Sequence, residues 1–278
     1  MFLYLTGIVQ YSHIKMYKQN LHTHTKFCDG KDTPEEIVLK AIELGFDTIG
    51  FSIHSPLQIP WDTEGYKKEI TRLKLIYSDR INILCGIEFE QCSTCDTSGY
   101  DYVIGTCHYF NINGTPVGFD RDAKIVQSVI DTYFDGDGLK FAKAYYRDMA
   151  TLYKRVKYDI VGHFDLITKN IEICKLFDTQ SKEYKNAAFE ALHAIIEDVQ
   201  VFEINTGTIA RGYRTTPYPA PFILKEIKNI GGKVILSSDC HDKSFLNCWF
   251  NESLELLKFC GFDKVAIYNH GEFKEIKI

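Results

Sequence analysis

The sequence lacks any Gly/Ser-rich or Pro-rich stretch that could link two domains. Its 278 residues are enough for one large α/β domain or two small ones, and a hydrophobic content of 45% is ample for a buried core. Because no linker divides the chain, we expect a single domain over residues 16–278, preceded by an N-terminal extension at residues 1–15.

This extension lacks the basic region and the small-residue cleavage site of a signal peptide. Its apolar stretch is also far shorter than the roughly 20 residues that cross a bilayer. We therefore expect no membrane anchor. Met16 is an alternative start, since it leads directly into the histidine motif at residues 22–24.

The chain also lacks a basic stripe. Its net charge is −5 and its basic residues are dispersed, so nothing favours nucleic acid as a partner. The nine cysteines lack the compact, even spacing of a secreted disulfide scaffold, which favours free thiols in a reducing cytoplasm. The Cys92-Ser93-Thr94-Cys95 motif has no second CxxC to complete a four-thiolate zinc site, so a plain loop is favoured over zinc or redox chemistry.

What the chain does contain is a series of potential metal ligands at the ends of apolar, strand-like runs. His22 and His24 open the series, and strand alternation would place both imidazoles on one side of an extended backbone. A lone histidine is usually structural, but the repeated placement favours ligation. The later members are His54, Glu88, His108, His163, Asp239 and His241.

Helical and strand-like periodicities alternate along the chain. Helices are expected near 34–44, 63–77, 138–156, 184–198, 219–230 and 244–260. Strands are expected near 20–24, 47–53, 81–89, 102–108, 159–163, 200–205, 233–238 and 264–268. This alternation predicts a parallel sheet with helical crossovers, either open and doubly wound or closed as a barrel.

The position of the ligands favours the barrel. An open sheet gathers a site at one switch point, whereas a barrel brings the carboxyl ends of all its strands to one mouth. The candidates come from at least six strands between residues 22 and 241, so only a barrel-like closure collects them easily. The stretch 109–138 is expected to be an irregular insertion that overhangs this mouth as a lid or substrate loop.

Taken together, these motifs resemble the polymerase and histidinol phosphatase (PHP) superfamily, and within it the monofunctional histidinol-phosphate phosphatases. The resemblance covers about residues 16–245 and rests on an ordered set of short segments. These are Leu21-His22-Thr23-His24, Cys28-Asp29-Gly30, Gly86-Ile87-Glu88, Gly162-His163-Phe164-Asp165-Leu166, Glu203-Ile204-Asn205-Thr206 and Ser238-Asp239-Cys240-His241.

The resemblance implies an α/β fold, a distorted TIM-like (β/α)7 barrel of the PHP type. It also implies two or three divalent metal ions (Zn, Fe or Mn) at the barrel mouth and hydrolysis of a small phosphate monoester, L-histidinol phosphate. By position, the first metal would be held by His22, His24, Glu88 and Asp239. Glu88 would bridge to a second metal on His108 and His163, and a third would bind Asp29, His54 and His241.

Mixed imidazole and carboxylate ligation independently suits Zn, Fe or Mn, and a carboxylate can bridge two cations. Paired metals lower the pKa of a bridging water, so the expected nucleophile is a metal-bound hydroxide. The DxDx[TV] motif of a covalent phosphoenzyme is absent. Asp239 or His241 is expected to protonate the leaving oxygen or to orient the water that does so.

A phosphate monoester also calls for fixed cations. Arg211 and Arg214 follow the expected strand 200–205 and are the first candidates for phosphate binding. Lys169 stands where the family tends to have another basic residue after the Gly-His-Phe-Asp run. Asp165 and Asn205 are candidates for orienting ligands or contacting substrate, with loop capping as the alternative.

Two other functions remain compatible with the sequence. One is a PHP-type phosphoesterase that acts on nucleotides or nucleic-acid ends, which the acidic charge balance and the absence of a fused polymerase region disfavour. The other is a non-catalytic metal-binding module. Such degenerate proteins usually lose ligands, whereas this chain has a histidine, aspartate or glutamate at all nine predicted ligand positions.

Overall fold

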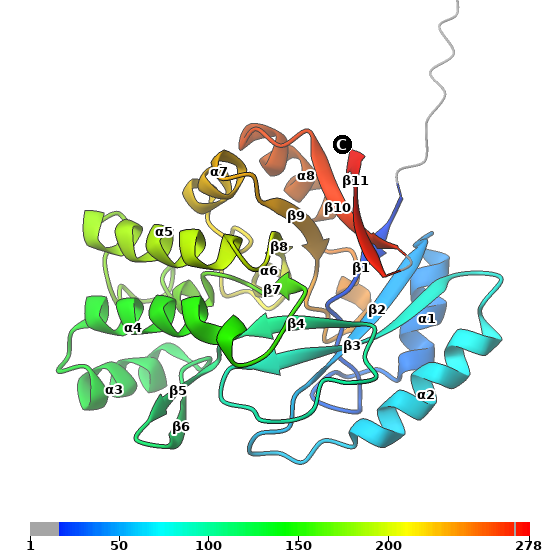
Figure 1. The fold of residues 1–278 in the computed structure, drawn as a ribbon, viewed down its shortest axis with the longest axis horizontal. Helices are drawn as coiled ribbons and strands as arrows, with labels where there is room; N and C mark the ends of the chain where they lie inside the picture. The colour runs from blue at the N-terminus through cyan, green and yellow to red at the C-terminus, as the bar shows by residue number, and fades with distance from the viewer. Residues whose placement is uncertain (1–16, 270) are drawn as a thin grey trace, which may run out of the picture.

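A seven-stranded parallel sheet forms the centre of the molecule in this computed structural model, which describes residues 17–269 and 271–278 (Figure 1). The predicted extension at 1–15 lies outside the described residues. The strands follow the order β1 (Gln19–Asn20), β2 (Thr48–His54), β3 (Asn82–Glu90), β4 (Tyr102–Thr106), β7 (Ile160–Val161), β8 (Val201–Asn205) and β9 (Lys233–Ser237).

The two edge strands of this sheet meet at the end where the predicted ligands lie. Thr23, just after β1, forms a parallel bridge with Cys240, just after β9. The backbone N–H of His24 donates to the Cys240 carbonyl at 2.8 Å, and the N–H of Cys240 donates to the His22 carbonyl at 3.1 Å. The sheet is therefore a nearly closed barrel, as predicted, and the segments that carry two of the ligand motifs form its seam.

The opposite end of the barrel is closed by the antiparallel hairpin of β10 (Lys264–Asn269) and β11 (Glu272–Lys277). Ala266 and Tyr268 of β10 pack on apolar side chains that point inward from β4, β7, β8 and β9. Gln19 of β1 donates to the Tyr268 carbonyl and accepts from its N–H, both at 2.8 Å. The strand predicted at 264–268 is present, but it covers the end of the barrel instead of joining the parallel sheet.

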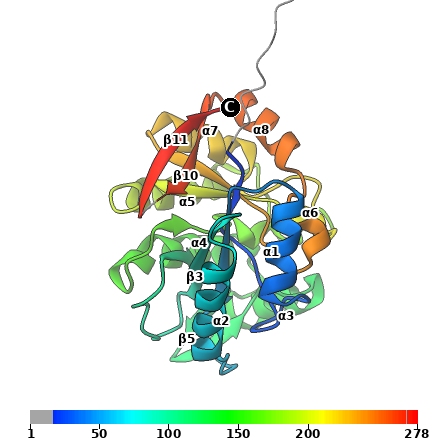
Figure 2. The same cartoon turned by 90° about the vertical axis from the view of Figure 1, so that its right-hand side faces the viewer.

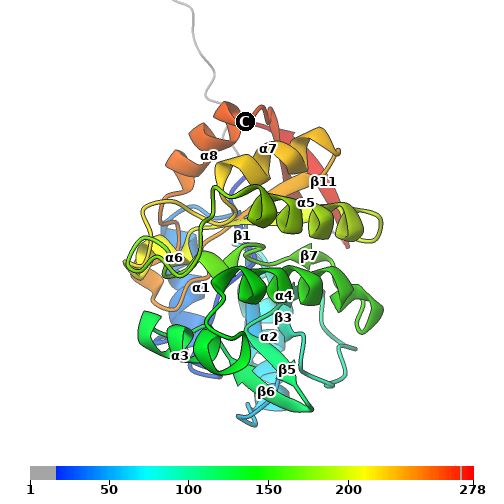
Figure 3. The ribbon, with the colours of Figure 1, turned by 90° about the vertical axis from the view of Figure 1, so that its left-hand side faces the viewer.

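Helices surround the sheet and bury the apolar outer faces of its strands. Figure 2 shows α1 and α2 on one side, and Figure 3 shows α3, α4 and α5 on the other. The helices are α1 (Pro34–Glu43), α2 (Thr63–Ile76), α3 (Ala123–Tyr133), α4 (Gly138–Thr151), α5 (Lys182–Ile196), α6 (Gly207–Ala210), α7 (Pro221–Asn229) and α8 (Phe250–Phe259). Short 3-10 turns lie at Leu152–Lys154, Leu166–Thr168 and Lys243–Phe245. None of the helices so described is long and apolar enough to span a membrane.

The insertion at 109–138 is more regular than predicted. It contains the hairpin β5 (Tyr109–Ile112) and β6 (Thr115–Gly118), followed by α3. Asn113 and Gly114 both have positive φ, at 51° and 85°, which is the conformation that a two-residue hairpin turn requires. Phe110 and Phe119 pack against each other with ring centroids 4.6 Å apart, and both pack on Phe141 of α4, so the insertion shares the main apolar core.

The helix predicted at 244–260 was also partly wrong, because α8 begins only at Phe250. The preceding residues serve the barrel seam instead. The carbonyl of Leu246 accepts from Asn20 Nδ2 at 3.0 Å and from Ser238 Oγ at 3.1 Å. These two bonds tie the loop to β1 and to the residue after β9. Because the Leu246 carbonyl is bonded to side chains, it is not used in a helix, and the backbone is irregular there.

Candidate metal centre

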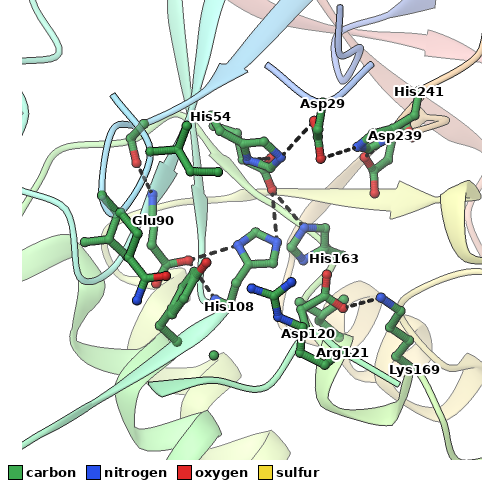
Figure 4. Close-up of a pocket in the computed structure, with 18 of the residues that line it drawn as sticks. Asp29, His54, Glu90, His108, Asp120, Arg121, His163, Lys169, Asp239 and His241 are labelled. Carbon is green, nitrogen blue, oxygen red and sulfur yellow. Dashed lines mark hydrogen bonds and ion pairs between the residues drawn. The ribbon is translucent and has the colours of Figure 1, made fainter. Parts of the chain in front are cut away.

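Nine histidine and carboxylate side chains converge at the carboxyl end of the barrel, and seven of them line the cavity shown in Figure 4. Glu88 lies at their centre, within β3. Its Oε2 lies 2.9 Å from His54 Nδ1 and 3.3 Å from the Nε2 atoms of both His22 and His24. Its Oε1 lies 3.0 Å from His163 Nε2 and 3.4 Å from His108 Nε2. The two oxygens thus face two separate sets of imidazoles, an arrangement that suits a bridging carboxylate.

The remaining carboxylates complete the cluster. Asp239 Oδ1 lies 3.3 Å from His24 Nε2 and 3.7 Å from His22 Nε2. Asp29 Oδ1 lies 3.4 Å from His54 Nε2, and its Oδ2 lies 3.3 Å from His241 Nε2. All nine residues predicted as metal ligands are therefore gathered at the barrel mouth.

Three groups of potential ligands are close enough to share an ion. They are His22 with His24 and Asp239, His22 with Glu88 and His163, and His24 with Asp29, His54 and His241. This division resembles the predicted one, with four differences. Glu88 is absent from the first group, and His22 also belongs to the second. His24 also approaches the third group, and His108 lies beside Glu88 without belonging to any of the three groups.

Several buried polar atoms in this cluster have no hydrogen-bond partner. They are His22 Nε2, His24 Nε2, His163 Nδ1 and Glu88 Oε2. Leaving a buried polar atom unsatisfied costs about 1–3 kcal/mol. His22 Nε2 and His24 Nε2 each lie 3.3 Å from Glu88 Oε2, so these three atoms call for a shared partner. Divalent cations are the partners that imidazole nitrogens and carboxylate oxygens share, and the residues present therefore fit a multi-metal site.

Two further carboxylates hold imidazoles in place from outside the cluster. The Nδ1 of His22 donates to Glu203 Oε1 at 2.7 Å, and the Nδ1 of His108 donates to Glu90 Oε2 at 2.9 Å. Each bond leaves the Nε2 lone pair facing Glu88. Glu203 also accepts from the backbone N–H of His163 at 2.9 Å, so it fixes two ligands at once. Glu203 belongs to a motif noted in the sequence, but its partner could not be inferred there.

Replacing Glu203 with Gln should weaken metal binding by roughly 10- to 100-fold, because an amide holds His22 in this tautomer less firmly than a carboxylate does. Competition with a chromophoric chelator measures the affinity. Glu252→Gln, the same change at an exposed position on α8, is the control. Unchanged affinity in Glu203→Gln would show that this carboxylate does not orient His22.

The electrostatics of the cluster favour the metal-binding form at His24 and Glu88. Burial, together with the neighbouring rings of His241 and His54, lowers the pKa of His24 to about 3. Burial alone would raise the pKa of Glu88, but the surrounding imidazoles, His22 and His54 foremost, outweigh it and hold that pKa well below its usual value. Neutral imidazole and ionised carboxylate are the forms that ligate cations. In contrast, burial alone would lower the pKa values of His22 and His54, but nearby carboxylates, Glu203 and Glu88 foremost, raise them, so these two imidazoles must lose a proton when they ligate.

Arg211 is the predicted phosphate-binding residue that reaches the cluster. Its Nη2 donates to Asp239 Oδ2 at 2.8 Å, and its Nη1 donates to the Asp239 carbonyl at 3.1 Å. Asp239 has a φ of 46°, in the left-handed region that side chains rarely adopt. A Cβ at Gly207 would lie 2.8 Å from the Asp239 Cβ and 3.0 Å from Arg211 Nη2, so the glycine leaves the space in which this pair forms.

The other two predicted phosphate-binding residues are placed differently. Lys169 lines the cavity, but its Nζ is paired with Asp120 Oδ1 at 2.7 Å. Arg214 does not line it: its side chain is 6% exposed, lies 3.8 Å from Asp165 Oδ2 and stacks on the Tyr218 ring at 4.9 Å. The guanidinium of Arg214 therefore contacts the loop after β7 and not the cavity, and a role in phosphate binding stays a prediction.

The cavity in front of the cluster has a volume of about 440 Å³. Its lining includes residues that the sequence did not single out, namely Trp61, Glu90, Tyr109, Asp120, Arg121 and Leu166. Tyr109, Asp120 and Arg121 come from the insertion, whose overhang at the mouth was predicted without naming the residues involved. The cavity is therefore lined by charged side chains, such as Asp120 and Arg121, and by apolar ones, such as Trp61 and Leu166.

Three comparisons relate the chain to known proteins. Residues 20–207 match the family model "PHP domain". The chain is 25% identical to a "Probable histidinol-phosphatase" of Schizosaccharomyces pombe, over 90% of this chain and 89% of that protein. It is 25% identical to a histidinol-phosphatase of Bacillus subtilis, over 86% of this chain and 99% of that protein.

Among solved structures, the fold is similar to that of histidinol phosphate phosphatase from Lactococcus lactis in complex with zinc, L-histidinol and phosphate. The TM-score is 0.71 at 20% identity, and the match covers 92% of this chain and 98% of that chain. At this level of identity the structural likeness establishes the fold.

Proposed function

The chain belongs to the PHP domain family, and on that premise we propose that it is a metal-dependent phosphomonoesterase that hydrolyses L-histidinol phosphate to L-histidinol and phosphate. The observation that carries the proposal is the convergence of nine imidazole and carboxylate ligands around Glu88 at the floor of a cavity of about 440 Å³. A cavity of this size accommodates a small monoester.

The residues proposed to hold the ions are the nine named from the sequence, with Glu88 as the shared carboxylate. Bound divalent ions supply two things here: a water acidified enough to act as nucleophile near neutral pH, and positive charge against the phosphoryl oxygens. The chain itself contributes the rigid barrel rim that fixes the ligands. Glu203 and Glu90 keep His22 and His108 in the tautomers that present Nε2 to the site.

Arg211 is proposed to bind the phosphoryl group from the side of β8 and α6. Its guanidinium is already ordered by Asp239, so little conformational entropy is lost when an anion binds. Arg121 is a second cation on the cavity wall, supplied by the insertion. Arg211 is the residue proposed to contact the phosphate, because Arg121 lies next to Asp120 and the ammonium of Lys169 is already paired with that carboxylate.

The proton for the leaving oxygen is proposed to pass through Asp239 or His241, whose Oδ1 and Nδ1 atoms lie 3.4 Å apart. Asp239→Asn and His241→Ala should separate the roles when each is tested on histidinol phosphate and on p-nitrophenyl phosphate. The alkoxide needs a proton and the nitrophenolate does not. Both residues are also proposed metal ligands, so weaker metal binding should lower activity on both substrates. Loss of the proton donor should add a further factor on the order of 100-fold or more on the first substrate alone. Equal losses on both substrates in both variants would mean that neither residue is the acid.

The proposed substrate is tested by a panel. Protein loaded separately with Zn, Mn or Fe is assayed with histidinol phosphate, nucleoside monophosphates and single-stranded DNA, and the kcat/KM values are compared. The highest value is expected for histidinol phosphate. A preference for the nucleotides would replace this function with the nucleotide-directed one, and no turnover with fewer than two bound ions per chain would favour a metal-binding module.

A cytoplasmic location also belongs to the proposal. It is supported by the nine cysteines, all of which carry free thiols in the structure, four of them buried. Free thiols persist in a reducing compartment.

A further inference from the structure

We propose that Asp120 is a specificity-determining residue, which binds a cationic nitrogen of the substrate while the metal cluster binds the phosphate. The inference rests on the proposed function and adds to it the class of substrate selected: phosphomonoesters that carry a protonated amine close to the ester. Asp120 follows β6 in the insertion and lines the cavity, with its side chain 31% exposed.

Asp120 differs from the other carboxylates of the cavity wall, which are Asp29, Glu88, Glu90 and Asp239. Asp29 and Glu88 face the ligand imidazoles with both oxygens. Asp239 is divided between Arg211 and the imidazoles. Glu90 accepts from His108 with one oxygen and from the Cys92 N–H with the other, at 3.3 Å. None of these four has an oxygen to offer a substrate amine.

Asp120 has an oxygen that could accept from a substrate amine. Its Oδ1 accepts from Lys169 Nζ at 2.7 Å, and the hydrogen bonds found among the described residues leave its Oδ2 without a donor. Figure 4 shows this ion pair at the edge of the cavity, with Arg121 next to it. Burial raises the pKa of Asp120, but the Lys169 ammonium outweighs that effect and keeps the pKa below its usual value, so the group is charged at neutral pH.

The position of the carboxylate is held by the backbone on both sides. The N–H of Phe119 donates to the His108 carbonyl at 3.0 Å, and the buried Phe119 ring packs on Phe110 and Phe141. On the other side, Asn170 Nδ2 donates to the Arg121 carbonyl at 2.9 Å. A carboxylate fixed in this way needs little rearrangement to accept a ligand ammonium, which is the condition for selective binding.

Asp120 places a negative charge on a part of the cavity wall that is otherwise cationic, since Lys169, His108 and Arg211 are all close enough to lower its pKa. A phosphoryl group is attracted to the ions and to Arg211, whereas an ammonium is repelled there and attracted to Asp120. A monoester with a phosphate at one end and an amine a few bonds away matches both, and it can bind in only one direction. Lys169 then serves as the partner that keeps Asp120 ionised and oriented before the substrate arrives.

The test compares histidinol phosphate with its analogue that lacks the amine, using wild type, Asp120→Asn, Lys169→Met and the double variant. Wild type should prefer the amine-bearing substrate by roughly 10- to 100-fold in kcat/KM, mostly through KM. Asp120→Asn should lose this preference while its kcat on the analogue stays close to wild type. Lys169→Met should keep most of the preference, because the carboxylate remains, although the ammonium that orients it is gone.

The double variant separates binding from an indirect effect. If Asp120→Asn acts only by freeing the Lys169 charge to repel the amine, removing Lys169 as well restores the preference, and the proposal is overturned. If the carboxylate itself binds the amine, the preference stays lost. A retained preference in Asp120→Asn also overturns the proposal.

The outcome can be told apart from a failure of the proposed function. If wild type prefers other phosphomonoesters, the same four proteins are compared with phosphoethanolamine and ethyl phosphate, a pair that differs by the amine alone. Loss of amine preference in Asp120→Asn on that pair supports the inference even though histidinol phosphate is not the substrate. Its retention overturns the inference whichever ester is hydrolysed.

Discussion

Replacing Glu88 with Gln should lower kcat/KM for histidinol phosphate by on the order of 1000-fold, which corresponds to about 4 kcal/mol of transition-state stabilisation. Glu88 is the one carboxylate whose two oxygens lie within 3.4 Å of five imidazoles. An amide of the same shape offers a single oxygen and no charge, so it cannot bridge two cations. The number of tightly bound ions per chain should fall in parallel with activity.

The matched control for this change is Glu64→Gln, which alters an exposed carboxylate on α2 and should leave both activity and metal content as in wild type. Circular dichroism distinguishes loss of the site from loss of the fold. Wild-type activity in folded Glu88→Gln protein would show that hydrolysis does not need a bridging carboxylate at residue 88.

Removing the metal ions should have the second large effect. Chelation should abolish hydrolysis and lower Tm by roughly 10 °C, since ions present at about 1000 times their Kd stabilise the folded state by about 4 kcal/mol. In the absence of ions, His22 Nε2, His24 Nε2 and Glu88 Oε2 are buried together with no hydrogen-bond partner. Adding back Zn, Mn and Fe separately, with scanning calorimetry and a phosphate-release assay, identifies which ion restores each property.

The His163→Ala variant provides the control for chelation. It lacks a ligand that lies 3.0 Å from Glu88, so its Tm should depend less on added metal than that of wild type. Full activity and an unchanged Tm in chelated wild-type protein would show that neither hydrolysis nor the stability of the cluster needs metal ions.

The ligands were predictable from the sequence because their position relative to strand ends is a local property. All but Asp29 lie at or just after the end of an apolar run, and in a barrel all such positions meet at one mouth. The closure itself was inferred from that same pattern, and the Thr23 to Cys240 bridge confirms it. The regular structure of the insertion could have been anticipated from Asn113-Gly114, whose positive φ values form the hairpin turn.

Other features depended on contacts between distant residues and had no local signal. Arg214 follows β8 in the same loop as Arg211, yet it turns toward Asp165 while Arg211 turns toward Asp239. The spacing of the two arginines in the sequence does not show which of them faces the cavity. Similarly, the pairing of Asp120 with Lys169 joins residues 49 apart, and the strand at 264–268 covers the barrel end because Gln19 binds Tyr268.

An anomalous difference map from crystals grown with zinc tests the central claim most directly, namely that ligands distant in the sequence hold several cations at one barrel rim. The account predicts at least two peaks, each within coordinating distance of nitrogen or oxygen atoms from the set His22, His24, Glu88, His163 and Asp239, with Glu88 next to two of them. Peaks confined to surface histidines such as His193, with none at the mouth, would contradict it.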